Sequence, residues 1–159
     1  MKQTAFTKHV TTMKQVTAAA LLGMALLTAP ALEAAAEAAK RVAIHVDEND
    51  PQRMTMALNN AQNIFKHYED AGQTVEIRLV AYGPGLHMFR EDTSPVKDRI
   101  AAMALEHEAL TFAACGNTLS AMSKQAGSDI ALVSEAEMVP SGVVELIELQ
   151  EDGWAYIRP

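Results

Sequence analysis

The stretch RVAIHVDENDPQRMTMALNNAQNIFKHY, residues 41–68, holds a strand pattern and a helix pattern in direct succession. Its first six residues alternate, with branched apolar side chains on one side, which is typical of a strand with a buried face. Asn49 or Asp50 can then cap a helix with Pro51 in its first turn, where a missing N–H costs nothing. The helix carries one apolar stripe at helical spacing: Met54, Ala57, Leu58, Ala61, Ile64, Phe65 and Tyr68. Gly72 is well placed to end it, so the stretch predicts a strand followed by an amphipathic helix.

The same alternation continues to the end of the chain. Further strands are predicted at residues 74–82, 110–115, 135–139 and 154–157. Helical segments are predicted at residues 86–92, from Ser94-Pro95 onward, after 110–115 with Asn117 as the cap, and at 143–152. Strands that alternate with helices predict crossover connections between parallel strands. We expect an α/β fold, a three-layer α/β/α sandwich with a mostly parallel sheet of about five strands.

The amino-terminal residues have the composition of a targeting segment. Residues 1–15 contain Lys2, Lys8 and Lys14 without an acid, residues 16–29 are almost wholly apolar, and Ala29-Pro30-Ala31 follows. This is the three-part pattern of a secretory signal peptide, and the apolar run is shorter than the roughly 20 residues that span a bilayer. We expect a signal peptide and Ala-rich spacer at 1–36 and one domain at 41–159. The expected location is periplasmic, without stable membrane anchoring after cleavage.

The charge balance excludes some partners. The chain has 13 basic and 20 acidic residues, and without the three leader lysines 10 basic residues face the 20 acids, a balance of about −10. Binding to phosphate groups needs clustered Lys and Arg side chains. We therefore expect no nucleic acid partner.

Cys115, within TFAACGNTLSAM at residues 111–122, is the only cysteine of the chain. It cannot pair within its own chain, so it is an inert buried thiol, an intermolecular disulfide or a reactive sulfur. A sulfur between a strand end and a helix start lies near free N–H groups and the positive end of the helix dipole, which favour a thiolate. Gly116 would leave the sulfur uncovered. These features favour the reactive interpretation.

The other candidate residues follow predicted strands, at the edge where open parallel sheets bind ligands. The catalytic candidates are Cys115 and His45, and the ligand-binding candidates are Gly83, Gly85, Gly116, Asn117, Ser141 and Gly142. His45 could pair with the thiolate or be a satisfied core residue, and His87 could reach the same edge. His67 and His107 fall on predicted helices. Glycine, proline and asparagine are also common in the loops of purely structural proteins.

Other site types find no support. The chain has no C-x-x-C, H-x-x-x-H or compact Cys/His cluster, so no metal site is predicted. The methionines form no cluster that suggests copper, and GPG at 83–85 is neither a P-loop nor a dinucleotide fingerprint. No cofactor is predicted.

The segments HVDENDP (45–51), LVAYGPG (79–85), ACGNTL (114–119) and VPSGVVELIELQEDGWAYIRP (139–159) together resemble the DsrE/DsrF-like family of the YchN type, in its exported single-domain branch. The resemblance implies a parallel α/β/α sandwich that usually assembles into trimers or hexamers. It also implies the chemistry of relatives that pass sulfur as a cysteine persulfide, with Cys115 as the sulfur-bearing residue.

The leading hypothesis is an exported sulfur-handling protein, a sulfurtransferase or sulfur carrier. Cys115 would hold sulfane sulfur as a persulfide between a donor and an acceptor, each a small molecule or a protein. His45 would assist proton transfer, and Ser141 and Gly142 would offer a second helix N-terminus to an anionic donor such as thiosulfate. The alternatives are a non-catalytic, homo-oligomeric small-ligand-binding module and a redox sensor that forms an intermolecular Cys115 disulfide.

Overall fold

The computed structural model describes residues 39–159, and the predicted leader at 1–36 lies outside the described residues. The elements in chain order are β1 (Lys40–Val46), α1 (Pro51–Asp70), β2 (Val75–Ala81), the 3₁₀ helix η1 (Gly83–Phe89), α2 (Lys97–Glu106), β3 (Leu110–Cys115), α3 (Gly116–Ala126), β4 (Ala136–Val139), α4 (Gly142–Glu151) and β5 (Ala155–Ile157). The predicted order of strands and helices is therefore confirmed. Within residues 39–159, no helix combines the length and apolarity that crossing a membrane requires.

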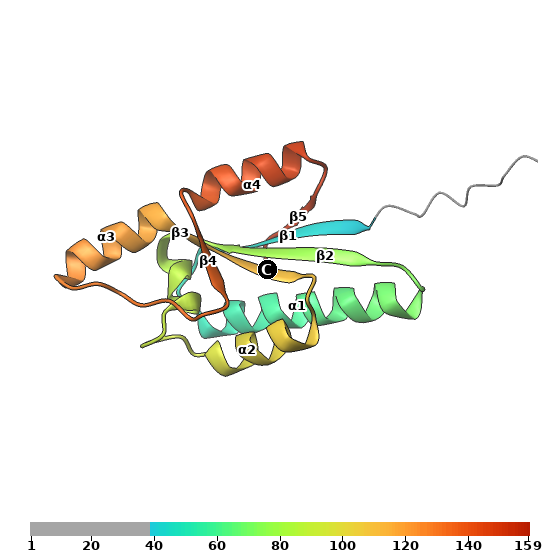
Figure 1. The fold of residues 1–159 in the computed structure, drawn as a ribbon, viewed down its shortest axis with the longest axis horizontal. Coiled ribbons are helices and arrows are strands. Elements are labelled where there is room, and N and C mark those ends of the chain that lie inside the picture. The colour runs from blue at the N-terminus through green and yellow to red at the C-terminus, as the bar shows by residue number, and fades with distance from the viewer. Residues whose placement is uncertain (1–38) are drawn as a thin grey trace, which may run out of the picture. The chain divides into compact units, whose positions relative to one another are not determined.

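The five strands form one sheet in the order β4-β3-β2-β1-β5, and every neighbouring pair is parallel. Figure 1 shows α4 on one face of this sheet and α1 and α2 on the other, so the three-layer α/β/α fold is confirmed. Because all described strands run in one direction, their carboxyl ends meet at one edge of the sheet. The register places His45 beside Val80 and Val80 beside Ala113, in one row across three strands.

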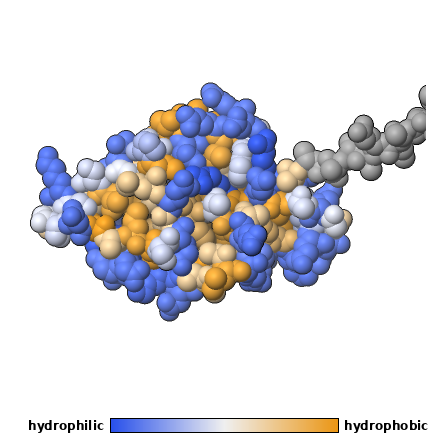
Figure 2. All heavy atoms as spheres, viewed as in Figure 1, coloured by the Kyte–Doolittle hydropathy of each residue, from blue (hydrophilic) through white to orange (hydrophobic). Residues whose placement is uncertain are grey.

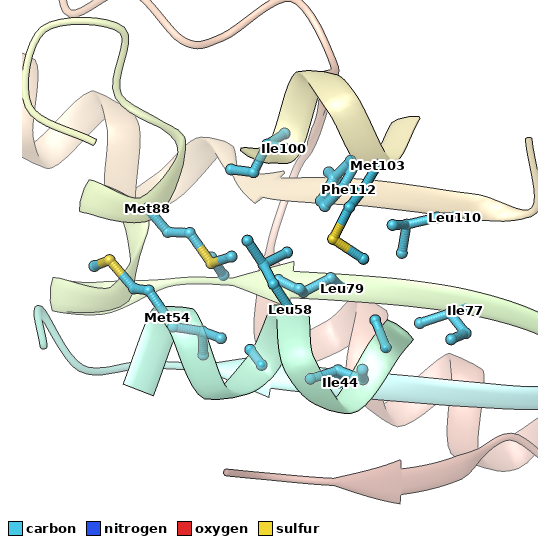
Figure 3. Packing of buried hydrophobic residues seen from close by; sticks show 14 of the residues in the cluster. Ile44, Met54, Leu58, Ile77, Leu79, Met88, Ile100, Met103, Leu110 and Phe112 are labelled. Atoms are coloured by element: carbon cyan, nitrogen blue, oxygen red, sulfur yellow. The ribbon is translucent and has the colours of Figure 1, made fainter. Parts of the chain in front are cut away.

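The larger core lies between the sheet and the layer of α1 and α2 (Figure 3). Alternate strand residues point into it, including Ile44, Leu79 and Phe112, each at most 1% exposed. The predicted stripe of α1 packs against them: Met54, Ala57, Leu58, Ala61 and Phe65 are buried, and Ile64 and Tyr68 are partly buried. This face of the first strand-helix pair follows directly from its sequence periodicity.

The smaller core lies under α4 and uses the opposite side chains of the same strands. Its buried members are Ala43, Val80, Ala113, Val139, Leu146 and Leu149, with Tyr82 and Trp154 partly buried against them. Alanines on the inner strands leave room for α4 to lie close to the sheet. Cys115 has the same parity along β3 as Ala113, so its side chain points to the α4 face.

Two predicted helix caps have different outcomes. Asp50 is the N-cap of α1, and its Oδ1 accepts a hydrogen bond of 2.8 Å from the Gln52 N–H. Asn117 is not a cap, because α3 begins at Gly116 and the N-cap position falls on Cys115 itself. β3 passes into α3 without an intervening loop residue, so the cap lies two residues earlier than predicted.

The GPG segment brings η1 against the end of β1. A Cβ at Gly85 would lie 2.2 Å from the backbone oxygen of Val46, which is far inside van der Waals contact. Gly83 has φ +51°, in the left-handed region that glycine adopts freely. Gly85 is therefore a packing requirement of the fold and leaves no open surface for a ligand at that position.

Gly85→Ala is predicted to destabilise the protein by more than about 3 kcal/mol, because the new methyl group meets rigid backbone. Urea unfolding followed by circular dichroism measures the loss. Gly72→Ala is the matched control: its Cβ meets open space, so only the left-handed backbone at φ +68° is strained, at about 1–2 kcal/mol. Equal losses in the two variants would contradict this account.

Candidate functional site at Cys115

Cys115 lies where β3, α3 and α4 meet at the carboxyl edge of the sheet. The residue is 4% exposed, so its sulfur is largely shielded from solvent. It is the last residue of β3 and the N-cap of α3, the position at which a side chain faces the free N–H groups of the helix. A sulfur atom here occupies the place that a serine or aspartate oxygen usually takes.

The surroundings of the sulfur favour the thiolate. Burial by itself raises the pKa of the Cys115 thiol, but hydrogen bonds from the Gly142 N–H, from the Thr118 hydroxyl and N–H and from the Asn117 N–H outweigh burial, and the pKa lies below its ordinary value. The N–H groups at the start of α3 do not form a side-chain capping hydrogen bond with Cys115. Their effect is on the charged form, which attracts every donor aimed at it.

The Gly142 N–H reaches the sulfur from α4, a different helix from the one that Cys115 caps. Gly142 is the first residue of α4, and a Cβ there would lie 3.2 Å from the Cys115 Cβ and 3.1 Å from the Tyr82 Cβ. The absence of a side chain thus lets the α4 N-terminus approach the sulfur. Two helix dipoles, of α3 and α4, point their positive ends at one atom. Ser141, the N-cap of α4, uses its carbonyl to accept from the Glu145 N–H at 3.0 Å.

Thr118 is a site residue that the sequence analysis missed. Its Oγ1 accepts a hydrogen bond of 3.0 Å from the Gly83 N–H, so the hydroxyl proton is left to be donated to the Cys115 sulfur. The signal in the sequence was a hydroxyl three residues after the cysteine, in the first turn of the predicted helix. Gly83 therefore affects the Cys115 sulfur indirectly, because its N–H orients the Thr118 hydroxyl.

His45 is placed away from the sulfur. It is 4% exposed, its Nδ1 shares a 2.8 Å hydrogen bond with the Tyr156 hydroxyl, and its ring stacks on Tyr82 with centroids 4.5 Å apart. The predicted pairing of His45 with the Cys115 thiolate is therefore not formed. β2 lies between β1 and β3, and Tyr82, which follows β2, occupies the intervening space.

The His45 and Tyr82 rings are both neutral at neutral pH. Burial is the main cause that lowers the pKa of His45, Arg158 adds to it, and Asp47 opposes it. Burial is likewise the main cause that raises the pKa of Tyr82 above its ordinary value. The His45 Nε2 is buried without a hydrogen-bond partner. The thiolate therefore has no imidazolium counter-ion, and its stabilisation comes from N–H and O–H donors.

The remaining predicted residues are dispersed. Gly116 packs against β4, since its Cβ would lie 3.1 Å from the Val139 oxygen, and the Asn117 N–H also bonds the Pro140 oxygen at 3.2 Å. His87 lies in η1, and its Nδ1 is 3.2 Å from the Thr93 hydroxyl. His67 lies on α1, and the ring of His107 stacks on Phe65 beyond the end of α2. Residues 39–159 contain no group of three His, Cys, Asp or Glu side chains that could hold a metal ion.

A family model for DsrE/DsrF-like proteins matches residues 40–159, which include every element of the sheet. The chain belongs to the DsrE/DsrF-like family. The solved structure of the protein of unknown function MTH1491 from Methanobacterium thermoautotrophicum is similar, with a TM-score of 0.65 and 34% sequence identity over 76% of this chain and 99% of that chain. No curated protein matches. Membership in the DsrE/DsrF-like family associates the chain with sulfur relay in general terms.

Thr118→Val is predicted to slow alkylation of Cys115 by iodoacetamide at pH 7 by about tenfold, because a hydrogen bond to the charged sulfur is lost. Thr118→Ser keeps the hydroxyl and is predicted to retain the wild-type rate. Rates measured from pH 5 to 10 separate a change in the pKa of the thiol from a change in the reactivity of the thiolate itself. The Val variant should recover the wild-type rate at high pH, where every thiol is ionised. A pH profile that is the same in all three proteins would contradict the role of Thr118.

Proposed function

We propose that this protein is an exported sulfur carrier in which Cys115 takes up sulfane sulfur as a persulfide and delivers it to an acceptor. The observation that carries the proposal is the set of donors from two helix N-termini and Thr118 around one buried sulfur. Such a setting lowers the pKa of the thiol and so raises the fraction of thiolate at a given pH, and the thiolate is the nucleophile in sulfur transfer. Family membership associates the chain with the same general chemistry.

The uptake step is a nucleophilic displacement at sulfur. The Cys115 thiolate attacks the outer sulfur of a sulfane donor, a new S–S bond forms, and the old S–S bond breaks as the donor's inner sulfur leaves as a thiolate. Delivery reverses the sequence: an acceptor thiolate takes the outer sulfur and the Cys115 thiolate leaves. A low pKa assists the second step as well, because a thiol of lower pKa is a better leaving group.

The donors around Cys115 suit both charged states of this cycle. The bare thiolate and the persulfide anion each carry one negative charge, and the N–H groups of Gly142, Asn117 and Thr118 are fixed by the backbone of two helices. Donors that are already oriented need no rearrangement when the charge moves by one sulfur atom. The Gly142 N–H, predicted to hold a separate anionic donor, serves the sulfur itself in this proposal.

The proposed location is periplasmic, on the basis of the signal-peptide pattern at 1–36. An oxidising compartment favours disulfides between exposed cysteines. A Cys115 that is 4% exposed cannot bring its Cα to within about 7 Å of another chain's cysteine without rearrangement. The burial of the thiol therefore argues against a direct disulfide between two copies of this chain, as the redox sensor requires.

We also propose that the protein is a homo-oligomer, a trimer or hexamer as the family resemblance implies. Exposed apolar side chains gather on the outer surface of α4 and on the edge strand β4: Val143, Val144, Ile147 and Met138 are 50%, 46%, 49% and 64% exposed. Figure 2 shows hydrophobic atoms at the top of the view, where Figure 1 places α4. Exposed apolar patches commonly mark protein interfaces.

Incubation of the purified protein with inorganic disulfide (HS–S⁻) is predicted to add the mass of one sulfur atom to Cys115, as read by intact-protein mass spectrometry. The thiolate is the only group in the chain with this nucleophilicity, since Cys115 is its only cysteine. Dithiothreitol should remove the added sulfur. Cys115→Ser is the control and should gain nothing.

An unchanged mass would overturn the proposed carrier function if the wild-type protein had been reduced with dithiothreitol and desalted before the incubation. The binding-module alternative predicts that Cys115→Ser keeps both the assembly state and ligand binding, whereas the carrier predicts complete loss of sulfur transfer to a thiol acceptor. The two functions are thus separated by one variant.

Ile147→Glu is predicted to shift the protein from an oligomer to smaller species, because a charge would be buried at the proposed α4 interface. Light scattering after size-exclusion chromatography measures the mass. Leu105→Glu is the control, since Leu105 is 89% exposed on α2, in the opposite layer. A wild-type protein that is monomeric at micromolar concentration would contradict the proposal.

A further inference from the structure

A groove lies between η1 and α3, beside the sulfur site. It has a volume of about 510 Å³, and its lining residues include Asn49, His87, Asn117, Thr118, Met122 and Gln125. We propose that this η1–α3 groove binds the organic part of a low-molecular-weight persulfide, R–S–SH, that loads Cys115. This inference rests on the proposed function and specifies the class of donor.

The groove is joined to the sulfur site through shared residues. Asn117 and Thr118 line the groove with one part of each residue and direct N–H groups at the Cys115 sulfur with another. Gly83, whose N–H fixes the Thr118 hydroxyl at 3.0 Å, lines the groove as well. Cys115 itself is not among the lining residues, so the persulfide arm of a molecule seated in the groove has to reach past Thr118 to the sulfur.

The chemistry of the lining selects for an uncharged organic group. Among the groove residues there is no Asp, Glu, Lys or Arg, although the chain as a whole carries a formal net charge of −7. The polar side chains are the amides of Asn49, Asn117 and Gln125, the imidazole of His87 and the hydroxyl of Thr118, and such groups pair with amide and hydroxyl groups. Met122 adds an apolar surface.

Size and charge together disfavour an inorganic anion in the groove. Pockets for organic molecules measure roughly 300–1,000 Å³, and this groove falls within that range. Thiosulfate would fill only a small part of it and would find no cationic side chain among the lining residues. An organic persulfide with amide groups fits both the volume and the donors and acceptors.

The transfer step is balanced without a further reactant. The Cys115 thiolate attacks the outer sulfur of R–S–SH, a new S–S bond forms, and the donor's own S–S bond breaks, with R–S⁻ as the leaving group. The leaving thiolate takes the proton of the S–H group, which yields R–SH and the Cys115 persulfide anion. The sulfane sulfur moves as a neutral atom, so no group is oxidised or reduced overall.

The test compares two donors and two variants of the full-length protein. The donors are the persulfide of N-acetylcysteinamide, which carries amides and no charge on R, and inorganic disulfide (HS–S⁻), which needs no groove. Ala121→Phe fills the groove from the exposed surface of α3, and Ala126→Phe makes the same change at the exposed end of α3, outside the lining. Initial loading rates are read by mass spectrometry, and urea unfolding verifies that both variants fold.

We expect Ala121→Phe to slow loading from the organic persulfide by about tenfold or more, with loading from inorganic disulfide within about twofold of wild type. Ala126→Phe should leave both rates within about twofold of wild type. The proposed role of the groove is overturned if Ala121→Phe loads from the organic persulfide at the wild-type rate, or if it slows loading equally with both donors. A wild-type protein that loads only from inorganic disulfide overturns the groove alone, and one that loads from neither overturns the proposed function with it.

Discussion

The structure depends on the close meeting of two helix N-termini at the end of β3. α3 starts at the cysteine itself, and α4 reaches the same sulfur because Gly142 has no side chain to keep it from Cys115 and Tyr82. The small residues of the inner strands, such as Ala113, let α4 lie close enough to the sheet for this contact. The electrostatic field at one atom is therefore set by the packing of a whole layer.

Much of the fold could be predicted because periodicity reports burial directly. The stripe from Met54 to Tyr68 and the alternation in β1 are local properties of the chain, and an all-parallel sheet follows once strands and helices alternate. Boundaries were less accurate, as Asn117 shows. A cap depends on where a strand stops, and β3 continues to the residue that begins the next helix.

The site could be predicted only in part. The position of Cys115 between a strand and a helix indicated N–H donors from α3, but the contribution of α4 depends on a contact between residues far apart in sequence. Thr118 needed the backbone of Gly83 to orient its hydroxyl. The catalytic role of His45 stays a prediction, because sequence can place a residue at an edge of the sheet but does not identify its neighbours. In the structure the His45 ring stacks on Tyr82, and its Nδ1 shares a hydrogen bond with the Tyr156 hydroxyl.

The most direct test is a titration of the Cys115 thiol in the wild-type protein, followed by thiolate absorbance in the ultraviolet from pH 4 to 10. Because Cys115 is the only cysteine, the Cys115→Ser protein supplies the complete background, including the tyrosines. The donors around the sulfur predict a thiol pKa below its ordinary value, so that the thiolate is present at neutral pH. A pKa at or above the ordinary value would mean that burial outweighs the helix ends, and the central claim would fail.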